Sequence, residues 1–179
     1  FRSPAIGAED LLLSFWIGWV LLLCGLQVWH LFLPVDARAM ILTAVLGAIG
    51  LLVGGLNPWI SGLRGVLRNL PVLVAAGLAA CWLSNLSMGG PRFGDSGAYH
   101  IPLVRWAAEH PIVPGLGNLY GHFGLASSHF LYLAWLDVGP FTQRSYHLAN
   151  GMLILALLVR ALLGAARLVR RDDERCTAD

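Results

Sequence analysis

The sequence is poor in charge and contains no lysine. Only 12% of its 179 residues are charged, about half the share that a soluble domain carries on its surface. All 12 basic residues are arginines, they are scattered along the chain, and the formal net charge is only +2. A nucleic-acid partner, which requires clustered basic residues, is therefore not expected.

Cysteine is scarce, and the motifs of several common enzyme classes are missing. Cys24, Cys81 and Cys176 form no CxxC pair and no even-numbered set, so neither a disulfide scaffold nor a thiolate metal site is expected. The sequence also lacks the GxSxG, phosphate-binding and dinucleotide-binding fingerprints. No signal peptide is recognisable, and the chain starts at Phe1. We therefore expect a fragment of a longer protein, or a chain trimmed at its start.

Long apolar runs dominate what is present. Hydrophobic residues make up 57% of the chain, and the mean hydropathy is +0.68. Uncharged runs cover residues 11–35, 39–63 and 69–91, and a fourth apolar run begins near Tyr146. Each is as long as the roughly 20 residues that a membrane-spanning helix needs. The sequence therefore predicts an all-α polytopic transmembrane protein with four or five spans and a long, partly helical extracytoplasmic loop.

The runs divide the chain into four segments. We expect three transmembrane helices in residues 1–88, an extracytoplasmic loop in 89–145, a transmembrane helix in 146–170 and a disordered polar tail in 171–179. Asn57-Pro58 is expected to end the second span, because the residue before proline disfavours helix. Pro71 suits the first turn of the third span.

The expected loop contains two helical patterns around a turn. "IPLVRWAAEH" predicts a short helix with Pro102 in its first turn, and "SSHFLYLAWLDV" predicts another with Ser127 or Ser128 as its N-cap. Both are expected at the membrane interface, and "HPIVPGLGN" between them predicts a turn. The segment Leu119–Leu136 is an alternative fifth span, although its glycines and histidines disfavour full lipid exposure.

Arginine placement predicts the orientation. With the residues around Arg64 and Arg68 in the cytoplasm, eight arginines fall inside and four outside, as the positive-inside rule requires. The inside set is Arg2, Arg64, Arg68, Arg160, Arg167, Arg170, Arg171 and Arg175, and the outside set is Arg38, Arg92, Arg105 and Arg144. Residues 89–145 then lie outside the cytoplasm.

The loop also carries the candidate chemistry. Asp95 and Tyr99 are four residues apart, so a helix would place them on one face. Asp95 could act as a general base or bind a divalent metal, and His100 and Glu109 are possible helpers. The alternative for Asp95 is a helix N-cap, and for Glu109 a solvated helix-end charge.

Two further loop residues are candidates for substrate binding. The Arg105 guanidinium could contact a phosphate and the Asn118 amide could bind sugar hydroxyls, although a lipid headgroup contact and a turn are equally simple roles. The five loop and fourth-span histidines lack the tight spacing of a zinc motif, and hydrogen-bonded interfacial histidines are the simpler interpretation. These are His100, His110, His122, His129 and His147.

Apolar spans followed by a loop that opens "GDSGAYH" resemble the GT-C class of polytopic glycosyltransferases. Those enzymes place an acidic residue in their first large extracytoplasmic loop, with an aromatic residue about four positions later, and Asp95 and Tyr99 match that pattern. The longer string "YHIPLVRWAAEHPIVPGLGNLYGHFGLASSHF" is similar to a group of uncharacterised bacterial multi-span membrane proteins. The resemblance implies a bacterial plasma-membrane location.

The resemblance also implies an activity, namely transfer of a sugar from a polyprenyl-phosphate donor to an extracytoplasmic acceptor. Asp95 would serve as base or metal ligand, with Mg²⁺ or Mn²⁺ as the possible metal. The chain departs from the class because Ser96 stands where an acidic pair is common, and because three spans precede the loop. The class also has about twice as many spans, so membrane lipid and the remaining spans of the full-length chain are expected partners. Two alternatives are a transporter or channel subunit and a non-catalytic membrane scaffold.

Overall fold

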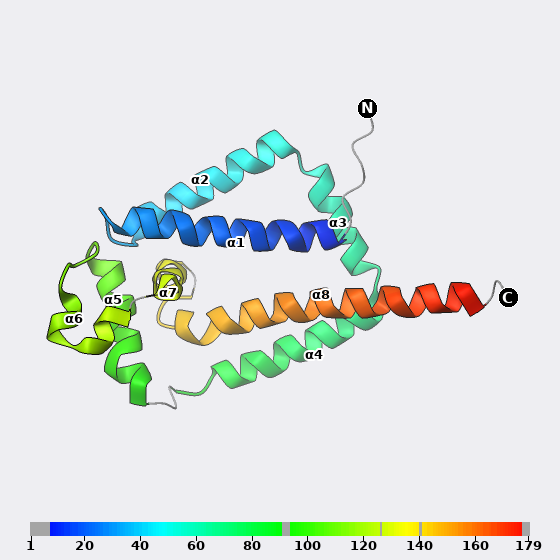
Figure 1. Ribbon diagram of the computed structural model, residues 1–179. Coiled ribbons are helices and arrows are strands. Elements are labelled where there is room, and N and C mark those ends of the chain that lie inside the picture. Colours follow the sequence, from blue (N-terminus) through cyan, green and yellow to red (C-terminus); the bar gives the residue numbers. More distant parts are fainter. Residues whose placement is uncertain (1–7, 91–93, 126, 140, 177–179) are drawn as a thin grey trace.

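The computed structural model describes residues 8–90, 94–125, 127–139 and 141–176 (Figure 1). Within these ranges all regular secondary structure is helical, which confirms the predicted all-α fold. The helices are α1 (Ala8–His30), α2 (Ala37–Gly54), α3 (Asn57–Leu67), α4 (Leu70–Ser87), α5 (Ile101–Glu109), α6 (Leu116–Leu119), α7 (Ser128–Val138) and α8 (Ser145–Cys176), with a π-helical turn η1 (Ser96–His100) and a 3-10 turn η2 (Gly121–Leu125).

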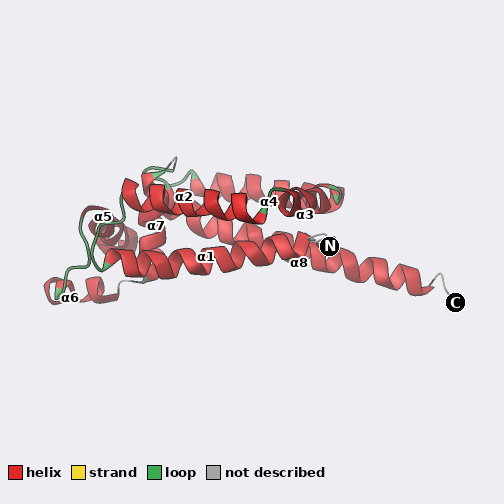
Figure 2. Ribbon diagram, turned by 90° about the horizontal axis from the view of Figure 1, so that it is seen from above, coloured by secondary structure: helices red, strands yellow, loops and turns green. Residues whose placement is uncertain are grey.

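Four of the helices are long and apolar enough to cross a membrane. These candidate spans are Asp10–His30, Ala37–Gly54, Leu70–Ser87 and Ser145–Leu168. The alternative fifth span does not form, because the segment 119–136 is divided among α6, η2 and α7. Figure 1 shows α7 end-on while α1 and α8 run across the view, and Figure 2 shows α7 from the side. Helix α7 therefore lies across the spans.

Proline and glycine set several helix boundaries. Helix α2 ends at Gly54 and is followed by Gly55, whose φ of 74° is a left-handed conformation that favours glycine. Asn57-Pro58, expected to end the second span, instead opens α3, with Pro58 in the first turn. A proline at that position has no intrahelical hydrogen bond to lose. Pro71 and Pro102 occupy the first turns of α4 and α5, as predicted.

The protein core is built around α7. Its residues Leu131–Ala134 and Leu136 are buried, and they pack with Leu26 of α1 and Ala149 of α8. Trp135 of α7 donates a hydrogen bond from Nε1 to Thr43 Oγ1 of α2 at 3.0 Å. The expectation that this helix lies at the membrane interface therefore misses its main feature, which is burial among α1, α2, α5 and α8.

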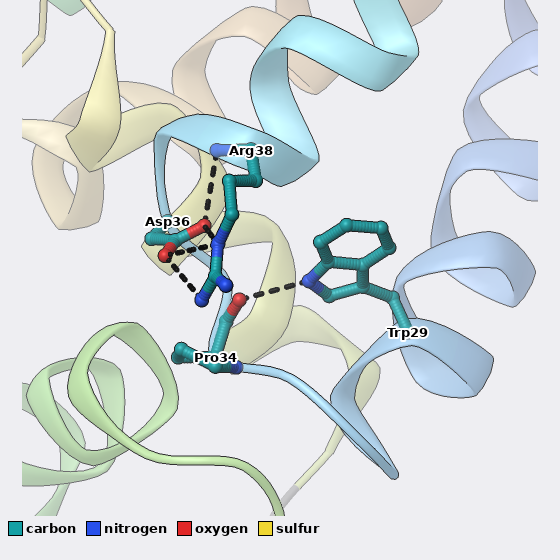
Figure 3. A network of polar contacts seen from close by, with 4 residues as sticks. All are labelled: Trp29, Pro34, Asp36 and Arg38. Carbon is teal, nitrogen blue, oxygen red and sulfur yellow. Dashed lines mark hydrogen bonds and ion pairs between the residues drawn. The ribbon is translucent and has the colours of Figure 1, made fainter.

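The loop is fastened to the connection between α1 and α2. The backbone N–H of Val35 donates to Ala107 O, and that of Ile112 donates to His30 O, both at 2.8 Å. Figure 3 shows the connection itself, where Trp29 Nε1 donates to Pro34 O. Asp36 caps α2 by accepting from the Arg38 backbone N–H at 3.0 Å and pairs with the Arg38 guanidinium at 2.9 Å.

The helices place the loop and the α3 region at opposite ends of the molecule. Helices α5, α6 and α7 and the start of α2 lie at one end, and α3 and the C-terminal end of α8 lie at the other (Figure 1). Helix α8 continues to Cys176, into the segment 171–179 expected to be a polar tail. Arg2, Arg92 and residues 177–179 lie outside the described residues.

Candidate functional site

Asp95 lies in the helical turn that leads into η1. Its backbone is helical, with φ −58° and ψ −32°, and its side chain makes no capping hydrogen bond. The N-cap alternative is therefore not realised by the carboxylate. The side chain is exposed to the surroundings, so it is accessible to a ligand that approaches this end of the molecule.

Asp95 and Tyr99 interact, as their spacing predicts. The pKa of the Tyr99 phenol is raised above its ordinary value of 10.0, first by partial desolvation and then by the negative charge of Asp95, by Tyr120 and by a hydrogen bond to Asp95. Each effect disfavours the phenolate. At neutral pH Tyr99 is therefore a protonated phenol close to the Asp95 carboxylate, to which a phenol can donate.

Tyr99 belongs to a group of five rings, here called the histidine–tyrosine cluster. Its members are Tyr99, His100, Tyr120, His122 and His129. The Tyr99 ring centroid lies 4.3 Å from that of His100 and 4.9 Å from that of His122. His122 also lies 4.8 Å from Tyr120. His129 is the fifth member, and it is connected through Phe130, whose ring centroid lies 6.4 Å from that of His129 and 5.5 Å from that of His100. Burial and then the charge of His100 lower the pKa of His129 below the ordinary 6.5. The cluster joins η1, η2 and α7, which are separate in the sequence.

Tyr120, His122 and His129 are the members that sequence reasoning did not select as site residues. From the sequence, the two histidines are interpreted as hydrogen-bonded interfacial residues because they lack the spacing of a zinc motif, and Tyr120 is given no role. The sequence does contain a signal, in that aromatic residues or histidines recur through "YH", "LYGHF" and "SSHF" on both sides of a Pro/Gly turn. A turn of that kind folds its flanks together, which brings these rings to one place.

The other predicted site residues do not join the cluster. Glu109 ends α5 and is exposed, and Arg105 is exposed on the same helix. Asn118 is also exposed and belongs to α6, where its backbone N–H donates to Gly115 O at 2.8 Å. The structure thus unites Asp95, Tyr99 and His100 and leaves the remaining three apart.

Beside the cluster lies a cavity of about 550 Å³, here called the loop cavity. It is open on one side and is lined by the end of α1, by α5 and the residues that follow it, by η2 and by the start of α7. Phe130 lines the cavity and its ring centroid is 5.5 Å from that of His100. Asp95, Tyr99 and His100 do not line it. Phe130 therefore forms the partition between the cavity and the cluster.

The structure brings no group of further metal ligands to Asp95, the predicted metal-binding residue, within the ranges that it describes. A divalent cation held by protein needs several carboxylate, carbonyl or imidazole donors around one point. Among the described residues, no three or more His, Cys, Asp or Glu side chains form such a group. The metal role of Asp95 therefore stays a prediction, with no such group around it in the part of the chain that the structure describes.

Four apolar spans, a buried crossing helix and a structured loop at one end define a polytopic α-helical membrane protein. A family model described as a domain of unknown function, DUF8201, matches residues 5–177. The chain belongs to this family. Comparison with the curated proteins and with the solved structures finds no match.

Proposed function

We propose that the chain is the N-terminal part of a GT-C-like glycosyltransferase, which moves a sugar from a polyprenyl-phosphate donor to an extracytoplasmic acceptor. The observation that carries the proposal is the Asp95–Tyr99 pair. An exposed carboxylate lies close to a protonated phenol at the loop end of the spans. The phosphate of a lipid-linked donor lies at the same depth, because its chain is anchored in the bilayer.

Asp95 supplies the base in this proposal. An acceptor hydroxyl gives its proton to the carboxylate, and the acceptor oxygen forms a bond to the anomeric carbon of the donor sugar. The bond between that carbon and the phosphate oxygen breaks, and the polyprenyl phosphate leaves with the electron pair. Tyr99 orients the carboxylate by hydrogen bonding, and His100, which adjoins Tyr99, faces the same cluster.

The test compares cells that carry the full-length protein with Asp95→Asn and with Asp137→Asn. The second variant is a matched control, because Asp137 Oδ1 accepts a hydrogen bond from Gln143 N at 2.7 Å and the amide oxygen of asparagine can still accept it. The measurement is the mass profile of cell-surface glycans, in comparison with a strain that lacks the gene.

Asp95→Asn should reproduce the glycan loss of the deletion strain, since removal of a general base costs roughly 10²–10⁴-fold in rate. Asp137→Asn should restore the glycan. Full restoration by Asp95→Asn, at equal protein level, would contradict the proposal and favour a scaffold. A deletion that leaves every surface glycan unchanged would contradict it as well.

A further inference from the structure

The loop cavity has the size and the mixed lining of a small-molecule site. Its volume of about 550 Å³ lies within the range of roughly 300–1,000 Å³ that is typical of ligand pockets. Segments that are distant in sequence build it, from the end of α1 to the start of α7. It includes Trp106, the turn "PIVPGLG" and the Ser127-Ser128 pair, so several unusual parts of the loop sequence face one space.

The polar groups of the cavity are few and carry no formal charge. Gln27, His30, Ser127 and Ser128 line it, and no Asp, Glu, Lys or Arg does. His30 lines the cavity from the end of α1, and an imidazole can donate or accept a hydrogen bond.

The rest of the lining is apolar, with aliphatic and aromatic side chains. Trp106, Phe123 and Phe130 line the cavity, together with Pro111 and Pro114. Trp106 is only half-buried and rests its ring against His110, with centroids 5.1 Å apart. Aromatic faces of this kind bind the apolar side of a ring, while the polar groups select its substituents.

The absence of charge in the lining decides which ligands fit. An ionised ligand would lose part of its hydration in the cavity without gaining a counter-charge, which is unfavourable. A neutral ring with several hydroxyls suits this lining, because its apolar face can contact the aromatic side chains and its hydroxyls can bond to the polar ones. Each hydroxyl can donate and accept, as can the imidazole, amide and serine groups that line the cavity.

The wall formed by the Pro/Gly turn is fixed by close backbone contacts. A Cβ atom on Gly117 would lie 3.1 Å from Gly124 Cα and 3.3 Å from Gly124 N, so a side chain there would require the backbone of η2 to move by a few tenths of an ångström. Gly115 has φ +83°, which favours glycine. The hydrogen bond from Ile112 N to His30 O ties the turn to α1. The cavity is therefore preformed.

We propose that the loop cavity binds an uncharged monosaccharide ring, stacked on Trp106 and hydrogen-bonded by His30 and the Ser127-Ser128 pair. The binding does not rest on the proposed function, because Asp95 does not line the cavity. The partition at Phe130 places the ring next to the cluster that contains Tyr99 and His100.

The test is saturation-transfer NMR on the purified chain in lipid nanodiscs. The probes are the methyl glycosides of glucose, galactose and mannose, compared with methyl glucuronide and methyl glucosaminide, which carry a charge. At least one neutral glycoside should bind saturably, and the charged ones should bind at least tenfold more weakly. Trp106→Leu should weaken binding at least tenfold, while Trp82→Leu, at an exposed position of α4 away from the cavity, should leave it unchanged.

Two further variants keep the test decisive if Trp106→Leu folds poorly. His30→Phe removes the hydrogen-bonding imidazole, and Ser128→Ala removes one hydroxyl of the lining; each should weaken binding. Absence of saturable binding to every neutral probe, or equal binding of a charged probe, would overturn the inference, as would binding that survives all three cavity variants.

Asp95→Asn separates this inference from the proposed function, because Asp95 does not line the cavity. Retained sugar binding with lost glycan transfer supports both proposals. Retained binding with full transfer contradicts the proposed function alone, and lost transfer without any sugar binding in the unaltered protein contradicts the cavity inference alone.

Discussion

At the residue scale, the contact between Asp95 and Tyr99 couples a carboxylate to the titration of a phenol. The Tyr99 pKa is raised, so the protonated phenol is the form that the folded state favours. The free energy that this contact contributes to folding is complete below pH 10.0 and is lost as the pH rises through the higher pKa of the folded state. The pair is therefore intact at neutral pH.

Asp95→Asn is expected to lower the Tyr99 pKa toward 10.0, because it removes the negative charge that repels the phenolate. The measurement is the ultraviolet absorbance of phenolate during an alkaline titration. Tyr99→Phe identifies which of the four tyrosine transitions belongs to Tyr99. Asp137→Asn is the control and should leave that transition in place. An unchanged Tyr99 transition in Asp95→Asn would show that the carboxylate and phenol are not in contact.

Asp36 has two separable roles, as a helix cap and as an ion-pair partner. Asp36→Ala removes both and is expected to lower the free energy of unfolding by about 0.5–2 kcal/mol, mainly through the lost cap. Asp36→Asn keeps a capping oxygen and should cost at most about 1 kcal/mol, since an exposed ion pair contributes little. Arg38→Ala should cost equally little. Denaturant unfolding of the purified protein in detergent measures all three.

The same carboxylate gives the stability a pH dependence of known sign. The Arg38 guanidinium, through its hydrogen bond, holds the pKa of Asp36 below the ordinary 3.8. The contribution of the charged form is therefore present above pH 3.8 and is lost as the pH falls through the lower pKa of the folded state. The difference between the unaltered protein and Asp36→Asn should vanish in that acidic window, and a difference that grows there would contradict the assignment.

At the scale of elements, local signals predicted helices well and packing poorly. Pro102 and the serine pair correctly marked the starts of α5 and α7. Asn57-Pro58 was misinterpreted because the same proline can follow one helix or begin the next. The burial of α7 could not be predicted, because an apolar side chain suits lipid and protein core equally. The cluster was missed for a related reason, since it depends on contacts among η1, η2 and α7.

Gly117→Ala tests whether the close approach of α6 and η2 shapes the loop. The new Cβ would meet the backbone of Gly124, which cannot yield as a flexible side chain would, so a loss of about 1–3 kcal/mol is expected. Gly121→Ala is the matched control, because nothing lies within 4 Å of its Cβ position. Thermal unfolding in detergent compares them. Equal melting temperatures for the two variants would show that the backbones are not in contact.

At the scale of the whole molecule, the helices sort the arginines between two ends. Arg38, Arg105 and Arg144 belong to elements at the loop end, and Arg64 and Arg68 belong to α3 and its C-cap at the other end (Figure 1). The last turns of α8, which carry several more arginines, extend beyond the α3 end. The arginines that the sequence assigns to opposite sides of the membrane therefore lie at opposite ends of the fold. By the positive-inside rule, the α3 end, which has more of them, is predicted to face the cytoplasm.

Single cysteines at the two ends test this orientation directly. In a chain whose own cysteines are replaced by alanine, Leu119→Cys and Leu67→Cys introduce thiols at exposed positions of α6 and α3. In sealed right-side-out vesicles, a membrane-impermeant maleimide should label the α6 thiol at once and the α3 thiol only after permeabilisation. The reverse pattern would place the Asp95–Tyr99 pair in the cytoplasm. A sugar-transfer reaction outside the cell would then be impossible at this site, whatever the effect of Asp95→Asn on glycans.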